Sequence, residues 1–145
     1  MAFSLSKHMN PFDIVSDFEK RLAEHFGSRY CVATDSCTHA VELCLRQQQI
    51  ESTSCPRHTY IRIPMTLMKL KLDWRFVDDQ WQEYYQFEST NIYDAATMWH
   101  KNNYISGSKM CLSFQKRKTL SLGRGGAILL DNKHDADQLR QMAYD

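Results

Sequence analysis

The spacing of apolar residues predicts two helices and a strand in the first third of the chain. Four apolar positions recur every three or four residues: Val15, Phe18, Leu22 and Phe26. This is the period of one face of an α-helix, and Asn10 with Pro11 provides a start and Gly27 a stop. The apolar run over residues 30–33 predicts a buried strand, and a second helix follows through residues 41–45.

The rest of the chain adds more strands than helices. The predicted elements are a helix over residues 64–72, strands over 74–77, 91–95, 109–114 and 126–130, and a helix over 136–144. Polar residues predict loops over 47–54 and 79–90. We therefore expect a single α/β domain over residues 1–145, a three-layer α/β/α sandwich with a mostly parallel sheet. Ligands of such sheets bind at the carboxyl ends of strands and the amino ends of helices.

Composition and charge narrow the classes of protein that fit. Of the 145 residues 43% are hydrophobic, enough for a core that needs no metal or disulfide. The net charge of +1 gives no electrostatic reason to expect nucleic acid or an anionic membrane, and no apolar run approaches the ~20 residues of a membrane span. Five scattered cysteines without a close pair indicate a reduced, cytoplasmic protein with no metal site.

Hydroxyl residues lie at the predicted turn from the first strand to the second helix. Ser36 and Thr38 flank Cys37 at the amino end of that helix. Free backbone N–H groups and the helix dipole favour an anion there, so the turn is a candidate phosphate site. Ordinary capping of the helix by the same hydroxyl groups is the alternative.

An acid and a lysine follow two later strands. Asp94 stands at the end of one strand with the small residue Ala95 after it, which leaves room for a ligand. Lys118 follows the strand over residues 109–114, and a lysine amine can act as a Schiff-base nucleophile. The alternatives are a helix cap or solvated acid for Asp94, and a basic surface hairpin around Lys118.

Seven segments along the chain have an order and spacing that are typical of one enzyme family. They are residues 18–27, 32–43, 56–60, 76–78, 94–96, 113–114 together with Lys118, and 125–129. In this order they resemble the DegT/StrS family of sugar aminotransferases. The resemblance implies pyridoxal 5′-phosphate (PLP) as cofactor and the large, cofactor-binding domain of the aspartate-aminotransferase type of fold.

The resemblance also implies a role for each candidate residue. Lys118 would hold PLP as a Schiff base and move a proton between substrate and cofactor. Asp94 would pair with the pyridine nitrogen and keep it protonated, and Tyr60, which by itself could be a core or rim residue, would stack on the ring. The remaining cofactor-binding positions are Ser36, Cys37, Thr38 and Ser113 around the phosphate, and Thr97 where the family commonly has a glutamine.

The sequence departs from the family pattern in several places. Cys37 replaces the usual glycine of the phosphate turn, and Arg124 stands where an acidic residue is usual. Only about sixteen residues separate Asp78 from Asp94, which indicates that a strand-and-helix unit is missing. The small carboxyl-terminal domain of the family has no counterpart in the sequence.

The function implied by the resemblance is a cytoplasmic transferase. It would move an amino group from an amino acid, such as glutamate, to a keto-sugar nucleotide. Because active sites of the family form between subunits, we expect a homodimer or a companion subunit that completes the site. A non-catalytic PLP-binding or assembly module is the alternative. Sugar dehydration fits less well, because relatives with that activity have histidine in place of the lysine found at Lys118.

Overall fold

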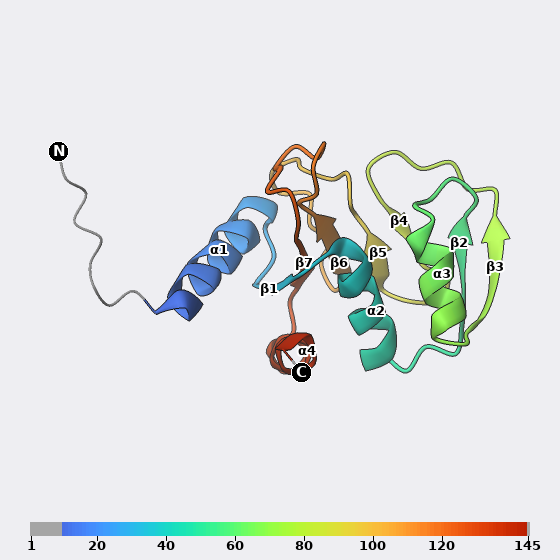
Figure 1. Cartoon of the computed structure of the whole chain (residues 1–145), viewed down its shortest axis with the longest axis horizontal. Helices are drawn as coiled ribbons and strands as arrows, with labels where there is room; N and C mark the ends of the chain where they lie inside the picture. Colours follow the sequence, from blue (N-terminus) through green and yellow to red (C-terminus); the bar gives the residue numbers. More distant parts are fainter. Residues whose placement is uncertain (1–9, 145) are drawn as a thin grey trace.

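The computed structural model of the protein describes residues 10–144, and Figure 1 shows their arrangement. The helices are α1 (Pro11–Phe26), α2 (Cys37–Gln47), α3 (Arg62–Lys69) and α4 (Lys133–Tyr144). The strands are β1 (Tyr30–Thr34), β2 (Ser52–Pro56), β3 (Asp73–Val77), β4 (Tyr85–Gln86), β5 (Ile92–Asp94), β6 (Lys109–Ser113) and β7 (Gly126–Leu130). Residues 1–9 and 145 of the predicted domain lie outside the described residues.

Five strands form the main sheet, in the order β1-β7-β6-β5-β4. The β5–β6 pair is parallel, whereas the β1–β7, β6–β7 and β4–β5 pairs are antiparallel. The predicted α/β class is confirmed, but the sheet is mixed and the prediction of a mostly parallel sheet is wrong. Parallel neighbours need a long crossover connection, usually a helix, and the segments that join β4 to β5 and β6 to β7 contain no helix. β1, β5 and β6 still run in the same direction, because β7 pairs in reverse with both β1 and β6.

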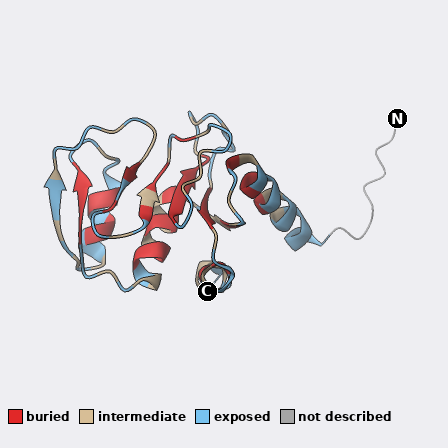
Figure 2. Ribbon diagram, turned by 180° about the vertical axis from the view of Figure 1, so that it is seen from behind, coloured by how far each residue is buried: buried red, intermediate tan, exposed pale blue. Residues whose placement is uncertain are grey.

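Helices cover both faces of the main sheet, as the predicted sandwich requires (Figures 1 and 2). Successive strand residues point to opposite faces, and the two faces bury different sets. The residues packed toward α1 are Cys31, Met110, Leu112, Ala127 and Leu129. The residues packed toward α2 and α4 are Val32, Cys111, Ile128 and Leu130. All five residues of β6 and all five of β7 are buried, so the core is centred on these two strands.

The helix ends follow from local capping. The Asn10 side chain accepts a hydrogen bond from the Phe12 N–H at 3.1 Å, and Gly27 ends α1 with a left-handed φ of 86°, which confirms the predicted boundaries. The start of α4 was predicted three residues too late. Its true start at Lys133 follows Asn132, whose side chain accepts from the Asp135 N–H at 3.0 Å.

β2 and β3 form a separate parallel pair joined by α3, which we call the β2–β3 unit. The loop predicted over residues 47–54 is wrong in its second part, because β2 begins at Ser52. The residues of β2 are mostly polar, so the pattern of apolar residues gave no signal for this strand. Their burial is made possible by hydrogen bonds such as that from Thr53 Oγ1 to the Glu88 carbonyl, at 3.1 Å.

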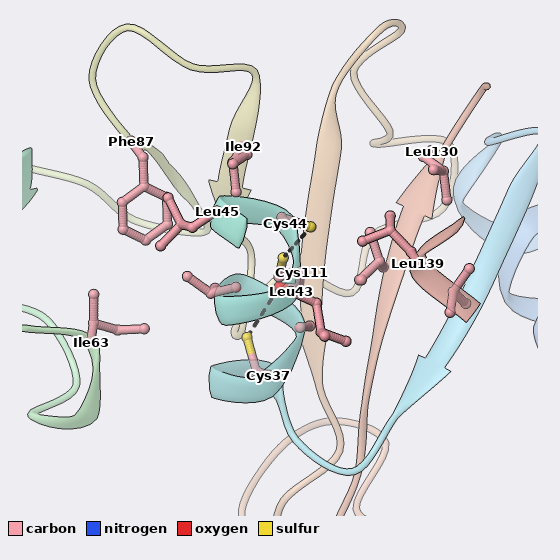
Figure 3. Close-up of a cluster of buried hydrophobic side chains, with 14 of the residues drawn as sticks. Cys37, Leu43, Cys44, Leu45, Ile63, Phe87, Ile92, Cys111, Leu130 and Leu139 are labelled. Atoms are coloured by element: carbon pink, nitrogen blue, oxygen red, sulfur yellow. Dashed lines mark hydrogen bonds between the residues drawn. The ribbon is translucent and has the colours of Figure 1, made fainter. Parts of the chain in front are cut away.

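Three of the five free cysteines pack at the junction of α2 with the main sheet (Figure 3). The Cys44 and Cys111 sulfur atoms lie 4.0 Å apart, and the Cys37 thiol donates to the Cys111 carbonyl at 3.4 Å. Buried thiols of this kind behave as small apolar groups with a weak donor. Among the described residues, no helix has the length and apolar character that crossing a bilayer would require.

Candidate active site

The carboxyl ends of β1, β5 and β6 meet at one edge of the main sheet, because these strands run in the same direction. A cavity of about 360 Å³ opens there, near the lower end of the range of roughly 300–1,000 Å³ for small-molecule sites. Six of the eight predicted site residues line it: Cys37, Thr38, Tyr60, Asp94, Ser113 and Lys118. The fold therefore gathers residues that are up to 81 positions apart in the sequence at a single site.

The amino end of α2 forms one wall of the cavity. Ser36 caps the helix: its hydroxyl accepts from the His39 N–H at 3.1 Å and donates to Asp35 Oδ1 at 3.1 Å. The N–H groups of Cys37 and Thr38 belong to the first turn, where a helix supplies no carbonyl partner. An anion such as a phosphate fits this position. The Ser36 side chain serves the cap and does not line the cavity.

The start of β7 holds this turn in place. A Cβ added at Gly126 would lie 2.5 Å from the Cys37 nitrogen and 2.6 Å from the Ser36 carbonyl oxygen. No side chain fits in that space. The glycine thus lets two backbones touch, and this contact fixes the position of the α2 amino end relative to the sheet.

Asp94 lines the cavity and is only 5% exposed. Its Oδ1 accepts from the Ala96 N–H at 3.0 Å, and its Oδ2 accepts from the Tyr85 hydroxyl at 3.0 Å. The Cys37 thiol approaches Oδ1 at 3.8 Å. The predicted alternative of a solvated loop acid does not describe this residue.

Burial raises the pKa of Asp94, while the Ala96 N–H, the Tyr85 hydroxyl and the Lys118 ammonium act to lower it. Burial and the nearby Asp94 charge raise the pKa of Cys37, so this thiol stays protonated and remains a donor. A buried carboxylate gains most from a cationic partner that enters its site. The protonated nitrogen of a pyridine ring is such a partner, so Asp94 fits the role that the resemblance implies.

Lys118 reaches the site from the loop between β6 and β7. Phe114 ties the loop together: its N–H donates to the Gly125 carbonyl and its carbonyl accepts from the Leu122 N–H, both at 2.9 Å. Lys118 is half-buried and donates its N–H to the Gln115 carbonyl at 3.0 Å. The loop connects two antiparallel strands, as the alternative prediction of a basic surface hairpin requires. It nevertheless places Lys118 at the cavity together with Asp94.

The other two predicted residues lie at the margin. Tyr60 lines the mouth of the cavity and is 51% exposed, so its ring is open to stack on a ligand. Thr97 lines a separate hollow of about 130 Å³ that also touches Ser113 and Lys118. Its hydroxyl donates to the carbonyl groups of Gln82 and Glu83, at 3.3 and 3.0 Å. The structure therefore does not bring Thr97 into the main cavity.

Two residues of the site were missed from the sequence. Tyr85 bonds to Asp94, and the Thr59 hydroxyl lies 2.6 Å from the Tyr85 hydroxyl. The segment over residues 79–90 was predicted as loop, but Tyr85 and Phe87 are both buried and flank the exposed Gln86. This alternation is the period of a strand, and it was a usable signal for β4.

A larger hollow of about 930 Å³ lies elsewhere, mostly over residues 79–89. Its lining includes the acids Asp79, Glu83 and Glu88 but no lysine, arginine or histidine. A phosphate would find neither a cation nor the start of a helix there. We therefore assign the candidate site to the smaller cavity, where Lys118 and the amino end of α2 converge.

The sequence matches the model of the DegT/DnrJ/EryC1/StrS aminotransferase family over residues 6–101, about two thirds of the chain. The chain belongs to this family. Its members depend on PLP. The match includes the α2 amino end and Asp94 but ends before Ser113 and Lys118, so the placement of these two rests on the geometry of the cavity. No curated protein sequence matches the chain.

Solved structures share the fold at low identity. DesI, crystallised in the presence of its TDP-sugar product, is 19% identical with a TM-score of 0.73 over 90% of this chain and 44% of its own. A DegT/DnrJ/EryC1/StrS aminotransferase from Brucella abortus is 19% identical with a TM-score of 0.73 over 92% and 49%. GDP-4-keto-6-deoxymannose-3-dehydratase, as an H188N mutant with bound GDP-perosamine, is 17% identical with a TM-score of 0.69 over 88% and 46%.

The present chain spans less than half the length of each of these proteins. Within residues 10–144 the elements correspond to a large domain of this fold, without a counterpart of the small domain. The fold is shared by an aminotransferase and a dehydratase, so it does not by itself choose the reaction. That choice depends on the side chains of the cavity.

Proposed function

We propose that the protein is a PLP-dependent aminotransferase in which Lys118 forms the Schiff base with the cofactor. The observation that carries the proposal is the shared cavity of Lys118, from the loop after β6, and Asp94, at the end of the neighbouring strand β5. PLP supplies an electron sink at the carbon attached to the amino group. A lysine amine, in place of histidine, favours amino transfer over sugar dehydration.

Each residue of the cavity would have a separate role toward the cofactor, which follows from its chemical group. The Lys118 amine would hold the cofactor covalently and, when the amine of the substrate takes its place, would be free to carry a proton at its Nζ atom. The Asp94 carboxylate would hold the proton on the ring nitrogen. At the other end, the N–H groups of Cys37 and Thr38, with the hydroxyl of Ser113, would bind the phosphate. The exposed ring of Tyr60 would cover one face of the pyridine.

The proposed substrates are an amino acid, such as glutamate, as donor and a keto-sugar nucleotide as acceptor. The family supports this class, because the chain belongs to a family of aminotransferases and shares its fold with sugar-modifying enzymes. The five thiols are free and buried, which agrees with the reducing conditions of the cytoplasm, where we place the protein.

The first experiment is covalent capture of the cofactor. Purified protein mixed with PLP should turn yellow, and borohydride should fix the cofactor on the peptide that contains Lys118. Lys118→Ala should lose both signals, whereas Lys101→Ala, which removes an exposed lysine that does not line the cavity, should keep them. If Lys118→Ala is labelled as well as the wild type, the proposal is wrong.

Amino transfer is tested next on the same sample. Glutamate should bleach the yellow form and release 2-oxoglutarate, because the amino group moves to the cofactor. A protein that captures PLP at Lys118 but never reacts with an amino acid would instead be a cofactor-binding module.

We also propose that a second copy of the chain, or a companion subunit, completes the substrate site. The supporting observation is the open mouth of the cavity, where half of Tyr60 is exposed. Light scattering after size exclusion should give a dimer mass at micromolar concentration. A monomer that still transfers amino groups would contradict the proposal, and a monomer that is inactive alone would direct the search to a companion chain.

A further inference from the structure

The segment between β3 and β5 contributes to the site although it is short for the family. Only about sixteen residues separate Asp78 from Asp94. The two-residue strand β4 lies between them. β4 pairs with β5 so that Tyr85 stands directly opposite Asp94. This register gives the short segment one defined point of contact with the candidate site.

Tyr85 links Asp94 to the β2–β3 unit through two hydrogen bonds. Its hydroxyl donates to Asp94 Oδ2 at 3.0 Å, and the Thr59 hydroxyl lies 2.6 Å from the Tyr85 hydroxyl oxygen. Because the Tyr85 proton is directed at the carboxylate, Thr59 acts as the donor to Tyr85. Each hydroxyl has one proton to give, so the pattern runs in one direction, from Thr59 through Tyr85 to Asp94.

The bond between Tyr85 and Asp94 is shielded from water. Tyr85 is 6% exposed and Asp94 5% exposed, and the Tyr85 ring packs edge-on against Trp81 and Phe87, with ring centres 5.1 and 5.4 Å away. Hydrogen bonds to a charged group are strong in such surroundings, and the loss of one leaves its partner unsatisfied. Packing of the ring also holds the hydroxyl at a fixed point.

Donors bind both oxygens of the Asp94 carboxylate. Tyr85 occupies Oδ2, while the Ala96 N–H and the Cys37 thiol approach Oδ1. A carboxylate held at both oxygens cannot rotate about its Cβ–Cγ bond without breaking one of these contacts. Its remaining acceptor sites then face a fixed direction, and Asp94 lines the cavity.

We propose that Tyr85, held by Thr59, is a positioning residue that orients the Asp94 carboxylate and keeps it ionised for a cationic ring nitrogen. The part of this inference that concerns the ring rests on the proposed function. The contact between Tyr85 and Asp94 does not, so the two can be tested separately. Thr59 also precedes Tyr60 in the chain, so the same bonds fix the loop that presents Tyr60 at the mouth.

The first arm of the test uses the cofactor-free protein. Carbon-13 NMR of carboxyl-labelled aspartate, with the Asp94 signal assigned from Asp94→Asn, gives the pH at which this acid titrates. The titratable groups around it are Tyr85, Cys37 and Lys118. Tyr85→Phe should raise the midpoint by about one pH unit, the equivalent of one hydrogen bond to a charged group. Thr59→Val should raise it by a smaller amount.

Tyr84→Phe is the matched control. Tyr84 is the neighbouring tyrosine, and its ring packs edge-on against Tyr93 with centres 5.8 Å apart. No hydrogen bond of its hydroxyl is found among the described residues. The midpoint of Asp94 should not move in this variant. Circular dichroism and the melting temperature establish that each variant is folded, and an unchanged midpoint in folded Tyr85→Phe would overturn the proposal.

The second arm uses protein loaded with PLP labelled with nitrogen-15 in the ring. In the wild type the chemical shift should be that of a protonated pyridine nitrogen. In Tyr85→Phe it should move toward the neutral value, because a more basic Asp94 draws the shared proton to itself, and PLP should bind about tenfold more weakly. A merely structural role for Tyr85 would leave the nitrogen shift unchanged.

The two arms distinguish failure of this proposal from failure of the proposed function. If the Asp94 midpoint moves but the wild type never captures PLP, the proposed function is wrong and the positioning contact stands. If the wild type captures PLP at Lys118 but Tyr85→Phe changes neither the midpoint nor the nitrogen shift, the function stands and the positioning role is wrong.

Discussion

The main sheet and the β2–β3 unit are built in different ways. Every residue of β6 and β7 is buried, whereas three of the five residues of β3 are exposed and β2 consists mainly of polar residues. Apolar packing holds the main sheet together. The β2–β3 unit is joined to the rest partly by side-chain hydrogen bonds, such as those of Thr53 and Thr59. The comparison indicates that the main sheet provides most of the stability and sets the positions of Asp94 and Lys118. The β2–β3 unit contributes to the site through the Thr59 hydroxyl, which contacts the partner of Asp94, Tyr85.

The largest effect should come from truncating the core of the main sheet. Ile128 on β7 is fully buried, so Ile128→Ala should lower the free energy of unfolding by about 4 kcal/mol. Phe76 on β3 is 41% exposed, and Phe76→Ala should cost about 1 kcal/mol. Urea unfolding of both variants gives the comparison. Equal losses would show that the two regions contribute equally to stability.

A smaller loss is expected where β7 touches the start of α2. Gly126→Ala places a methyl group against backbone atoms of Ser36 and Cys37 that cannot turn away, and should cost about 3 kcal/mol and weaken PLP binding. Gly107→Ala is the control: its space is open, and only its φ of 80° disfavours a side chain, for about 1 kcal/mol. If the two variants lose the same stability, the contact at Gly126 does not constrain the turn.

The same division explains what could be predicted from the sequence. Helix α1 and strands β6 and β7 were found because their apolar patterns and caps are local signals. β2 was missed because its buried residues are polar and depend on distant partners such as Glu88. The mixed sheet was missed because strand direction is set by connections rather than by the strands themselves.

The candidate site shows a similar limit. The strand-end rule gathered Asp94 and Lys118 at one cavity, the expected anion site at a helix start supplied Thr38, and the family pattern supplied Tyr60. The bond between Tyr85 and Asp94 depends on the register of a two-residue strand, which single-sequence patterns cannot fix. Ser36 and Thr97 do not line the cavity, because their hydroxyl groups form hydrogen bonds with nearby backbone groups instead.

The pH dependence of stability gives a smaller effect, at Asp94, where the main sheet meets the β2–β3 unit through Tyr85 and Thr59. Burial raises the pKa of Asp94 above its unfolded value, so the folded state holds this proton more tightly. Stability of the cofactor-free protein should therefore fall as the pH rises from the unfolded pKa through the folded one. Asp94→Asn should remove that fall, which urea unfolding at a series of pH values would measure.

Asp135 supplies a control of opposite sign within the main-sheet region. Burial acts to raise its pKa, but the buried Lys109 ammonium, 3.0 Å away, outweighs this and lowers the pKa. Its contribution is present above the unfolded pKa and is lost as the pH falls through the folded value. Asp135→Asn should thus remove the loss of stability at acid pH that is due to Asp135, and leave in place the fall with rising pH that is due to Asp94.

The smallest effect is expected at the surface contact between the two regions. Lys69 on α3 donates to both carboxylate oxygens of Glu42 on α2, each at 2.9 Å. The lysine side chain is 66% exposed and that of Glu42 is 14% exposed, so Lys69→Met should change stability by about 1 kcal/mol or less, and less still at high salt. A loss above about 2 kcal/mol, well outside the range for exposed ion pairs, would mean that the β2–β3 unit is held mainly by charge.

The most direct test of the account is a crystal structure of the protein grown with PLP. We predict continuous density between Nζ of Lys118 and the cofactor, the ring nitrogen within hydrogen-bond distance of the Asp94 carboxylate, and the phosphate at the amino end of α2. PLP bound instead in the larger hollow over residues 79–89, or attached to another lysine, would contradict it.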